Sequence, residues 1–423
     1  STPDEPSMQY EQIIAILLAM ATLFSYLNDR LLKVSPTIGM LLLSLLVGAA
    51  ISIASYFGCD VGQQQWITLL DSLDFRRALM DGMLGFLLFA GAMQVQYRVL
   101  VHERWEIMIL ATAGTLLATF FIGGLTWLAL RIAGIEMPFV YALVFGALIS
   151  PTDPIAAVAI LKKAGMPERL ETVISGESLF NDGVGAVLFS VIASIAISGE
   201  MPAATQISFE FFKEVCGGVL LGAALAGFGG YLLRGYREDS SKLLVTLAIV
   251  TCGGVLARAL HVSNPIAMVV AGLIVGRVSI EETGESCQLV LGTTWKLIED
   301  VLNAVLFLLL GLFVMKEPDS ISLLPMVLAI GVVLVGRMLS VAIPVRLWRF
   351  RQPPNSAEFR LYMLMTWGAL RGAISLALVL SLPDSSERKL LFEMTYAVVA
   401  VSYTHLTLPT IQHWCRSRWS RER

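Results

Sequence analysis

Long apolar stretches, separated by short polar or glycine- and proline-bearing breaks, recur along the chain and restrict what it can fold into. A helix needs about 20 mostly apolar residues to cross the hydrocarbon layer of a bilayer. About thirteen such stretches can be marked, approximately at residues 11–32, 36–57, 79–100, 105–133, 137–164, 172–198, 212–233, 241–260, 264–278, 293–315, 322–347, 359–382 and from 389 onward. We therefore predict an all-α, polytopic membrane protein.

The composition supports this fold class and excludes others. Of 423 residues, 56% are hydrophobic and 15% are charged, whereas about 25% of the residues in a soluble domain are charged. The net charge of −3 and the lack of a basic run give no reason to expect nucleic acid as a partner. The cysteines form no CxxC pair, so they predict neither a zinc site nor a disulfide framework. The acidic N-terminal segment lacks the features of a signal peptide, so we expect the first apolar stretch to be retained as a helix.

The loops predict the orientation in the membrane. Lysine and arginine are roughly twice as frequent in one set of alternate loops as in the other, and the richer set marks the cytoplasmic side. With an odd number of spans, the N-terminus is predicted outside and the C-terminus in the cytoplasm.

The fifth stretch contains a carboxylate between two prolines in the segment SPTDP. Pro151 and Pro154 each remove a backbone donor and disfavour helical geometry in the preceding residue. Ser150 and Asp153 are therefore predicted to be extended, with Thr152 in an unwound segment. Unwound backbone at membrane depth occurs where it lines a cavity or is buried in protein. The alternative is a simple proline kink without a functional role. The carboxylate between the two prolines favours a functional site.

The sixth stretch, ISGESLFNDGVGAVLF, concentrates polar side chains on one helix face. Spacings of three and four residues bring Ser178 near Asn181 and Asp182, and Glu177 near Asn181. Carboxylate, hydroxyl and carbonyl oxygens suit a hard cation such as sodium, and Thr152 on the broken helix could add another. Burial favours the protonated form of a carboxylate, so Asp182 could alternate between a proton and a cation. Alternatively, Ser178 and Asn181 are only satisfied helix polar groups.

Two arginines lie within apolar stretches and need partners. Glu177 is the best candidate for Arg337, although Arg337 could also snorkel toward a basic loop. Arg371 lies between Gly368 and Gly372, which predicts a second broken helix. Interrupted helices in the two halves of a transporter indicate an inverted repeat with its site at the membrane midplane.

The segments SPTDPIAAVAIL, ESLFNDG and GALRGAISLAL, in this order, resemble the NhaP/NHE-type sodium/proton antiporters, the first monovalent cation:proton antiporter family. The resemblance implies a bacterial inner-membrane protein that is a homodimer and contains crossed, unwound helices in spans 5 and 12. It also implies a structural ion pair of Glu177 with Arg337. The cation- and proton-binding residues would be Asp182, Asn181, Ser178, Asp153 and Thr152, with support at the broken helices from Arg371, Pro151, Pro154, Gly368 and Gly372.

The predicted function is secondary active exchange of Na⁺, with Li⁺ or K⁺ as further possibilities, for H⁺ by alternating access. The Asn181–Asp182 pair resembles the electroneutral branch, which exchanges one cation for one proton. The transported sodium would bind at Asp182, Ser178 and Thr152. We expect a secondary active transporter and not an enzyme. No cofactor is expected, and since no GxxxxGK[ST] motif for ATP is present, an ion gradient would supply the energy. Ala90 stands where many bacterial relatives carry an acid, so K⁺/H⁺ exchange remains an alternative.

Two other classes of membrane protein fit the sequence less well. A sodium-coupled solute symporter of related fold would need a larger substrate cavity, and an intramembrane aspartyl protease would need a GxGD motif, which is missing here.

Two further regions give weaker signals. The polar residues Lys296, Glu299, Asp300 and Asn303 open the tenth span, where solvation of a helix end explains them as well as a functional surface does. Residues 1–401 are predicted to form a single transmembrane unit. The polar segment from 402 to 423 interrupts the last span, so we expect it to be non-native; a natural amphipathic cytoplasmic tail is the alternative.

Overall fold

Helices account for almost all of the structure. The computed structural model describes residues 10–34, 36–57, 66, 82–95, 97–153, 158, 168–199, 203–236, 238–282, 285–313, 322–348, 366, 368 and 371–407. Its helices, in chain order, are α1 (Tyr10–Leu27), η1 (Asn28–Leu32), α2 (Pro36–Tyr56), α4 (Leu84–Gln94), α5 (Tyr97–His102), α6 (Arg104–Ile109), η3 (Leu110–Gly114), α7 (Thr115–Ile132), α8 (Phe139–Ile149), α10 (Glu168–Ser198), α11 (Ala204–Gly235), α12 (Asp239–Leu260), α13 (Asn264–Glu282), α14 (Glu285–Phe313), α15 (Leu323–Trp348), α17 (Ala373–Leu380) and α18 (Ser386–Thr407). The predicted all-α fold class is confirmed.

Many of these helices suit a bilayer. Within the described residues, seven helical segments are long and apolar enough to cross a membrane, and three shorter apolar helices accompany them, Leu84–Gln94, Phe139–Ile149 and Asn264–Ile280. Parts of the predicted spans 79–100, 137–164 and 359–382 lie outside the described residues. The total of thirteen spans therefore stays a prediction. The helix α18 continues through Thr407, and residues 408–423 of the predicted tail lie outside the described part of the chain.

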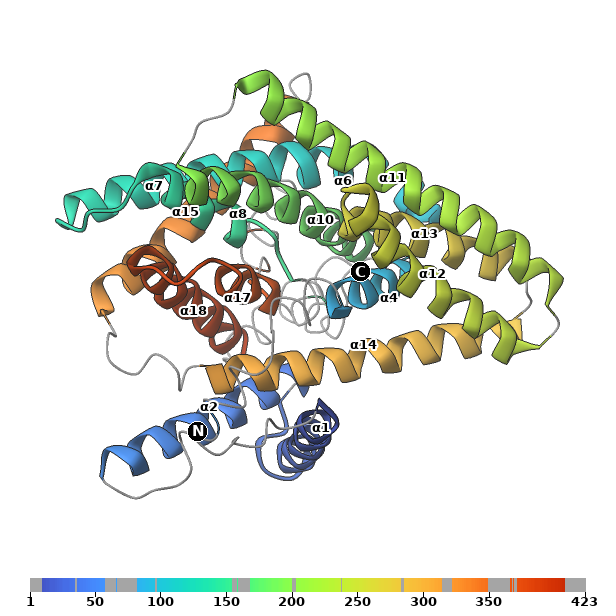
Figure 1. Ribbon diagram of the computed structural model, residues 1–423, viewed down its shortest axis with the longest axis horizontal. Helices are drawn as coiled ribbons and strands as arrows, with labels where there is room; N and C mark the ends of the chain where they lie inside the picture. The colour runs from blue at the N-terminus through green and yellow to red at the C-terminus, as the bar shows by residue number, and fades with distance from the viewer. Residues whose placement is uncertain are drawn as a thin grey trace, which may run out of the picture.

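The helices pack around α10, which runs through the middle of the bundle (Figure 1). On one side α10 contacts α8, which also packs on α7 and α17. On the other side it contacts α11 and α13, and α13 packs closely on α4. The long helix α14 contacts α2, α4 and α17 (Figure 1). As a result, α4, α8, α10, α14 and α17, which are distant in sequence, surround one central region.

The end of α7 and the approach of α8 depend on glycines. Gly134 has φ of +76°, a conformation that residues with a Cβ adopt at a cost. Its N–H donates to the carbonyl of Arg131 at 3.2 Å and the N–H of Ile135 donates to Leu130 at 2.9 Å, which satisfies the last carbonyls of the helix. At Gly123, an added Cβ would lie 2.9 Å from the carbonyl oxygen of Ala142. The lack of side chains here allows α8 to pack directly against α7.

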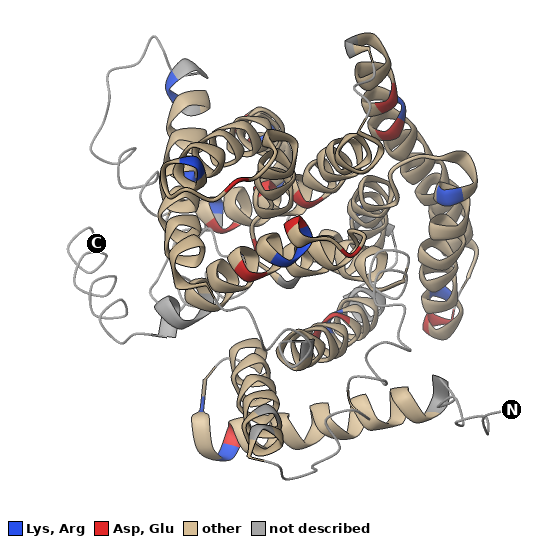
Figure 2. Ribbon diagram, turned by 60° about the vertical axis from the view of Figure 1, so that its left-hand side comes forward, with Lys and Arg blue, Asp and Glu red and all other residues tan. Residues whose placement is uncertain are grey.

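Charged residues are sparse in this bundle (Figure 2). Among the described residues, the buried charged side chains are Glu103, Glu177, Lys242, Arg337 and Arg371. Glu103 is paired with Arg169 at 2.7 Å, and Lys242 with Asp239 at 3.6 Å. Because a charge within a membrane bundle is costly unless it is paired, hydrated or used, the remaining three draw attention to the region around α8, α10 and α17.

Candidate functional site

The helix break after α8 forms one wall of the site. The helix ends at Ile149 with Ser150 as its C-cap, and residues 151–153 continue without helical structure. Ser150 itself keeps right-handed helical angles, φ −67° and ψ −37°, so the prediction that it is extended was wrong. Its N–H still donates to Gly146 and its hydroxyl donates to Ala147, both at 3.0 Å. These bonds hold Ser150 in the last helical turn, and the unwinding begins one residue later. Pro154 lies outside the described residues.

A second break lies against the first. The helix α17 begins at Ala373, and Gly372 before it is extended, with φ −91° and ψ −178°. Arg371 is 1% exposed, and its Nη1 donates to the carbonyls of Ser150 at 2.8 Å and Pro151 at 3.0 Å. A guanidinium at this place neutralises the partial negative charge at the C-terminal end of α8. The predicted residues Arg371 and Pro151 are thus brought together. Gly368, also a predicted support residue, lies in a turn and is buried.

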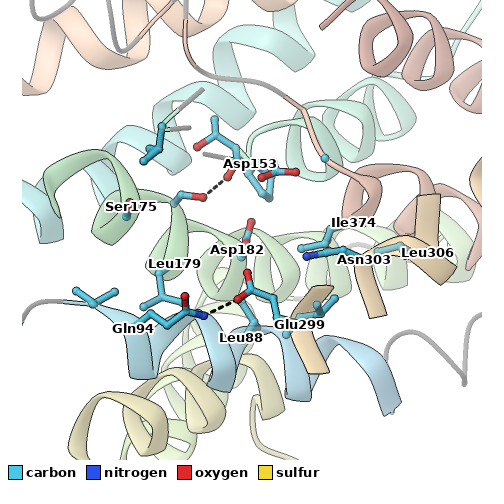
Figure 3. Close-up of a pocket in the computed structure, with 18 of the residues that line it drawn as sticks. Leu88, Gln94, Asp153, Ser175, Leu179, Asp182, Glu299, Asn303, Leu306 and Ile374 are labelled. Carbon is cyan, nitrogen blue, oxygen red and sulfur yellow. Dashed lines mark hydrogen bonds between the residues drawn. The ribbon is translucent and has the colours of Figure 1, made fainter. Parts of the chain in front are cut away.

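Gly372 allows the two breaks to approach closely. A Cβ added to it would lie 3.0 Å from Cβ and 3.2 Å from Oδ2 of Asp153. The carboxylate of Asp153 therefore lies beside the start of α17, on the cavity side of the contact (Figure 3).

The polar face of α10 binds the unwound segment. The hydroxyl of Ser178 donates to the carbonyl of Thr152. The Asn181 amide makes two bonds with the same residue: Nδ2 donates to Thr152 Oγ1 at 3.0 Å, and the Thr152 N–H donates to Asn181 Oδ1 at 3.3 Å. All three side chains are buried. These contacts fix the Thr152 carbonyl and the Ser178 hydroxyl next to each other, which are two of the predicted sodium ligands.

Asp182 projects into a cavity next to this cluster. The cavity has a volume of about 410 Å³ and is lined by residues of α4, α10, α14, α17 and the break at 151–153. Asp182 lies between Asp153 on one side and Glu299 on the other (Figure 3). Within the part of the chain that the structure describes, the Asp182 carboxylate has no hydrogen-bond or ion-pair partner. It is partly exposed to the cavity, so its oxygens are available to a cation or a proton.

Glu177, five residues before Asp182, points to a different partner. Arg337 of α15 holds its carboxylate with two contacts, Nη1 to Oε1 at 2.8 Å and Nη2 to Oε2 at 2.9 Å. The side chain of Arg337 is 4% exposed and that of Glu177 is 2% exposed. Asn181 Nδ2 also lies 3.4 Å from Glu177 Oε1. One acid of ESLFND is thus occupied by a guanidinium, whereas the other, Asp182, faces the cavity.

The cavity also contains polar residues to which the sequence analysis gave no clear role. Glu299 and Asn303 of α14 line it, together with Gln94 of α4. Gln94 Nε2 donates to Glu299 Oε2 at 2.5 Å (Figure 3). Glu299 and Asn303 are four residues apart, which places them on one helix face, but no signal in the sequence separates them from Lys296 and Asp300, which have the same spacing. Those two form an exposed pair at 3.8 Å.

Ala90 of α4, where the family resemblance led us to expect an acid, is fully buried among apolar neighbours and does not line the cavity. The acidic residues that line the cavity are Asp153, Glu171, Asp182 and Glu299.

The fold and the site of the described residues define a class: a polytopic, helical membrane transporter with a cation-compatible, acidic cavity next to the end of α8 and the start of α17. The family model described as "Sodium/hydrogen exchanger, transmembrane" matches residues 15–412. The chain belongs to the sodium/hydrogen exchanger family, as the resemblance in the sequence implied.

Similar proteins agree with this membership. The Na(+)/H(+) antiporter NhaP of Pseudomonas aeruginosa is 41% identical over 394 residues, covering 92% of this chain and 93% of the relative. The Na(+)/H(+) antiporter NhaH of Halobacillus dabanensis is 30% identical over 399 residues, covering 93% and 94%. A solved structure of the sodium proton antiporter MjNhaP1 from Methanocaldococcus jannaschii matches with a TM-score of 0.71 at 18% identity, covering 98% of both chains. The last match supports the fold.

Proposed function

We propose that this protein is a secondary active antiporter that exchanges Na⁺ for H⁺ at Asp182. The observation that carries the proposal is the Asp182 carboxylate, which faces the cavity without a partner among the described residues while the other acid of its motif is paired. Family membership and the names of the relatives support sodium and protons as the ions.

The neighbouring oxygens suit sodium. A hydroxyl that donates one hydrogen bond keeps lone pairs, and so does a carbonyl that accepts one. The Ser178 hydroxyl and the Thr152 carbonyl, which bond to each other, therefore still offer oxygens to a cation held by Asp182. Asn181 fixes Thr152 in place through its amide. Proton and cation compete for the same carboxylate, so Asp182 releases one when it takes up the other.

Exchange also requires that Asp182 reach both sides of the membrane in turn. The two non-helical segments, 151–153 and 371–372, touch each other beside Asp182 through Arg371 and Gly372. Discontinuous helices that meet at the site are the arrangement through which alternating access operates in many transporters. We take the contact between the segments as support for crossed, unwound helices and for alternating access here.

The proposal is tested by transport in proteoliposomes. The protein is reconstituted with an internal pH-sensitive dye, a pH gradient is imposed, and NaCl, LiCl or KCl is added without any organic solute. We expect Na⁺ to dissipate the gradient at lower concentration than K⁺. Dissipation by K⁺ in preference to Na⁺ would support the K⁺/H⁺ alternative, and no response to any cation without a solute would contradict antiport.

The stoichiometry gives a separate prediction. Asn181 lies beside Asp182 where a second titrating acid could stand, so a single carboxylate would carry either one proton or one cation per half-cycle. No net charge would then cross the membrane, and exchange should be independent of voltage. The measurement is Na⁺-driven proton flux under potassium–valinomycin potentials of both signs. A flux proportional to the potential, or a current on a solid-supported membrane, would mean that a second group such as Asp153 titrates during the cycle.

We further propose that the protein is a homodimer of the bacterial inner membrane with the N-terminus outside and the C-terminus in the cytoplasm. The family resemblance supports the dimer and the membrane, and the uneven distribution of lysine and arginine among the loops supports the orientation.

A further inference from the structure

The cavity that contains Asp182 extends into the bundle along α14. Its lining residues on this helix follow the spacing of one face: Glu299, Asn303, Leu306 and Phe307. Their exposure decreases in that order, since Glu299 is partly exposed, Asn303 is 8% exposed, and Leu306 and Phe307 are each 1% exposed. Glu299 therefore lies at the outer end of the cavity and Phe307 at its closed end.

The residues of α4 that line the cavity also become more exposed toward the end at which Glu299 lies. Leu88, which lines the inner part, is 4% exposed, whereas Gln94, one and a half turns further along, is an exposed residue. Gln94 and Glu299 are joined by the 2.5 Å hydrogen bond across the mouth. Asp182 lies inward of this pair, between it and Asp153 (Figure 3).

We propose that Glu299 is a cation-receiving residue at the mouth of the cavity, which attracts the monovalent cation and passes it to Asp182. This inference rests on the proposed function, since it assigns a further binding residue to the same exchange reaction. A cleft lined by one sign of charge concentrates counter-ions and raises their association rate. Glu299 supplies that charge at the outer end, where a cation first meets the cavity.

The contact with Gln94 explains why this carboxylate is suited to receive and release a cation. Gln94 Nε2 also lies 3.2 Å from the carbonyl of Ala90, so its amide is anchored to its own helix while it holds Glu299 Oε2. One carboxylate oxygen is thereby oriented, and Oε1 has no partner among the described residues. An amide donor holds the carboxylate without neutralising it, whereas a lysine or arginine at this place would cancel the attraction.

The test compares two acids on the same helix. Glu299→Gln removes the charge at the mouth, and the matched control Asp300→Asn removes a charge from the next residue, which is 59% exposed, paired with Lys296 and not part of the cavity lining. In proteoliposomes we expect Glu299→Gln to raise the Na⁺ concentration for half-maximal exchange about tenfold, with the maximal rate within about twofold of the parent. Asp300→Asn should leave both values unchanged.

Ionic strength separates this electrostatic role from a structural one. Because salt screens exposed charges, added N-methylglucamine chloride should raise the half-maximal Na⁺ concentration of the parent and have much less effect on Glu299→Gln. Glu299→Asp, which keeps the charge, should stay near the parent, and Gln94→Ala, which frees the carboxylate, should lie between the parent and Glu299→Gln. These two variants give the answer if Glu299→Gln does not fold.

The outcomes distinguish this inference from the proposed function. A parent protein without cation-driven proton movement would contradict the proposed function itself. An active parent with an unchanged half-maximal Na⁺ concentration in Glu299→Gln, or with the same increase in Asp300→Asn, would overturn the role of Glu299 only. Loss of the maximal rate in Glu299→Gln at a normal half-maximal concentration would also overturn it, since that result indicates a role after cation binding.

Discussion

Asp182→Asn is expected to reduce Na⁺-driven proton movement to the level of liposomes without protein. The substitution replaces a carboxylate by an amide of nearly the same shape, so the side chain can neither carry a proton nor provide a negative charge for sodium. The other acid of the motif cannot take over, because Glu177 is held by Arg337 at 2.8 and 2.9 Å. The measurement is the dye assay at saturating sodium, on protein reconstituted in equal amounts.

The folding of this variant should be unimpaired, because the Asp182 carboxylate has no partner among the described residues and an amide is easier to bury than a charge. Size-exclusion elution and thermal stability in detergent should therefore match those of the parent. Asp300→Asn again serves as the control for the loss of one acid. Sodium-driven proton movement that persists in Asp182→Asn would show that another carboxylate, with Asp153 or Glu299 nearest in the cavity, is the exchanging group.

The sequence predicted the fold class because thirteen apolar stretches leave few alternatives. It also predicted which residues meet around the break, since short-range rules govern them. Two prolines around Asp153 each remove a backbone donor and so favour a break in the helix at that point. The spacing of Glu177, Ser178 and Asn181 places them on one face of α10.

Contacts between distant segments were less predictable. The prediction for Ser150 was wrong for a different, local reason: its hydrogen bonds to Gly146 and Ala147, four and three residues earlier, outweigh the preference of a residue before proline for extended backbone. The role of Glu299 was missed because a polar residue near the start of an apolar span is normally solvated. Only the packing of α14 against α4 shows that this acid faces the cavity.

Arg337→Ala is expected to destabilise the protein strongly. Glu177 and Arg337 are almost fully buried, at 2% and 4% side-chain exposure, and removing one partner of such a pair costs about 3–5 kcal/mol because the other charge stays buried and unpaired. We expect low expression and a lower melting temperature in detergent, with the half-maximal sodium concentration of the surviving protein little changed. Arg337→Lys should be intermediate, since an ammonium keeps the charge but lacks the planar, two-point geometry of a guanidinium.

The double variant Arg337→Ala with Glu177→Gln tests whether the penalty comes from the unpaired acid. Glutamine fills the same space as glutamate without a charge, and it can still meet the Asn181 amide that lies 3.4 Å from Glu177 Oε1. Part of the lost stability should therefore return, so that the double variant melts above Arg337→Ala alone.

The non-additivity is read from the full cycle of parent, two single variants and the double variant. If the double variant is less stable than the sum of the single effects requires, Arg337 stabilises the protein through contacts other than Glu177. A recovered melting temperature together with retained exchange would instead separate the two acids of the motif: Glu177 would serve the structure, and Asp182 would carry the ions.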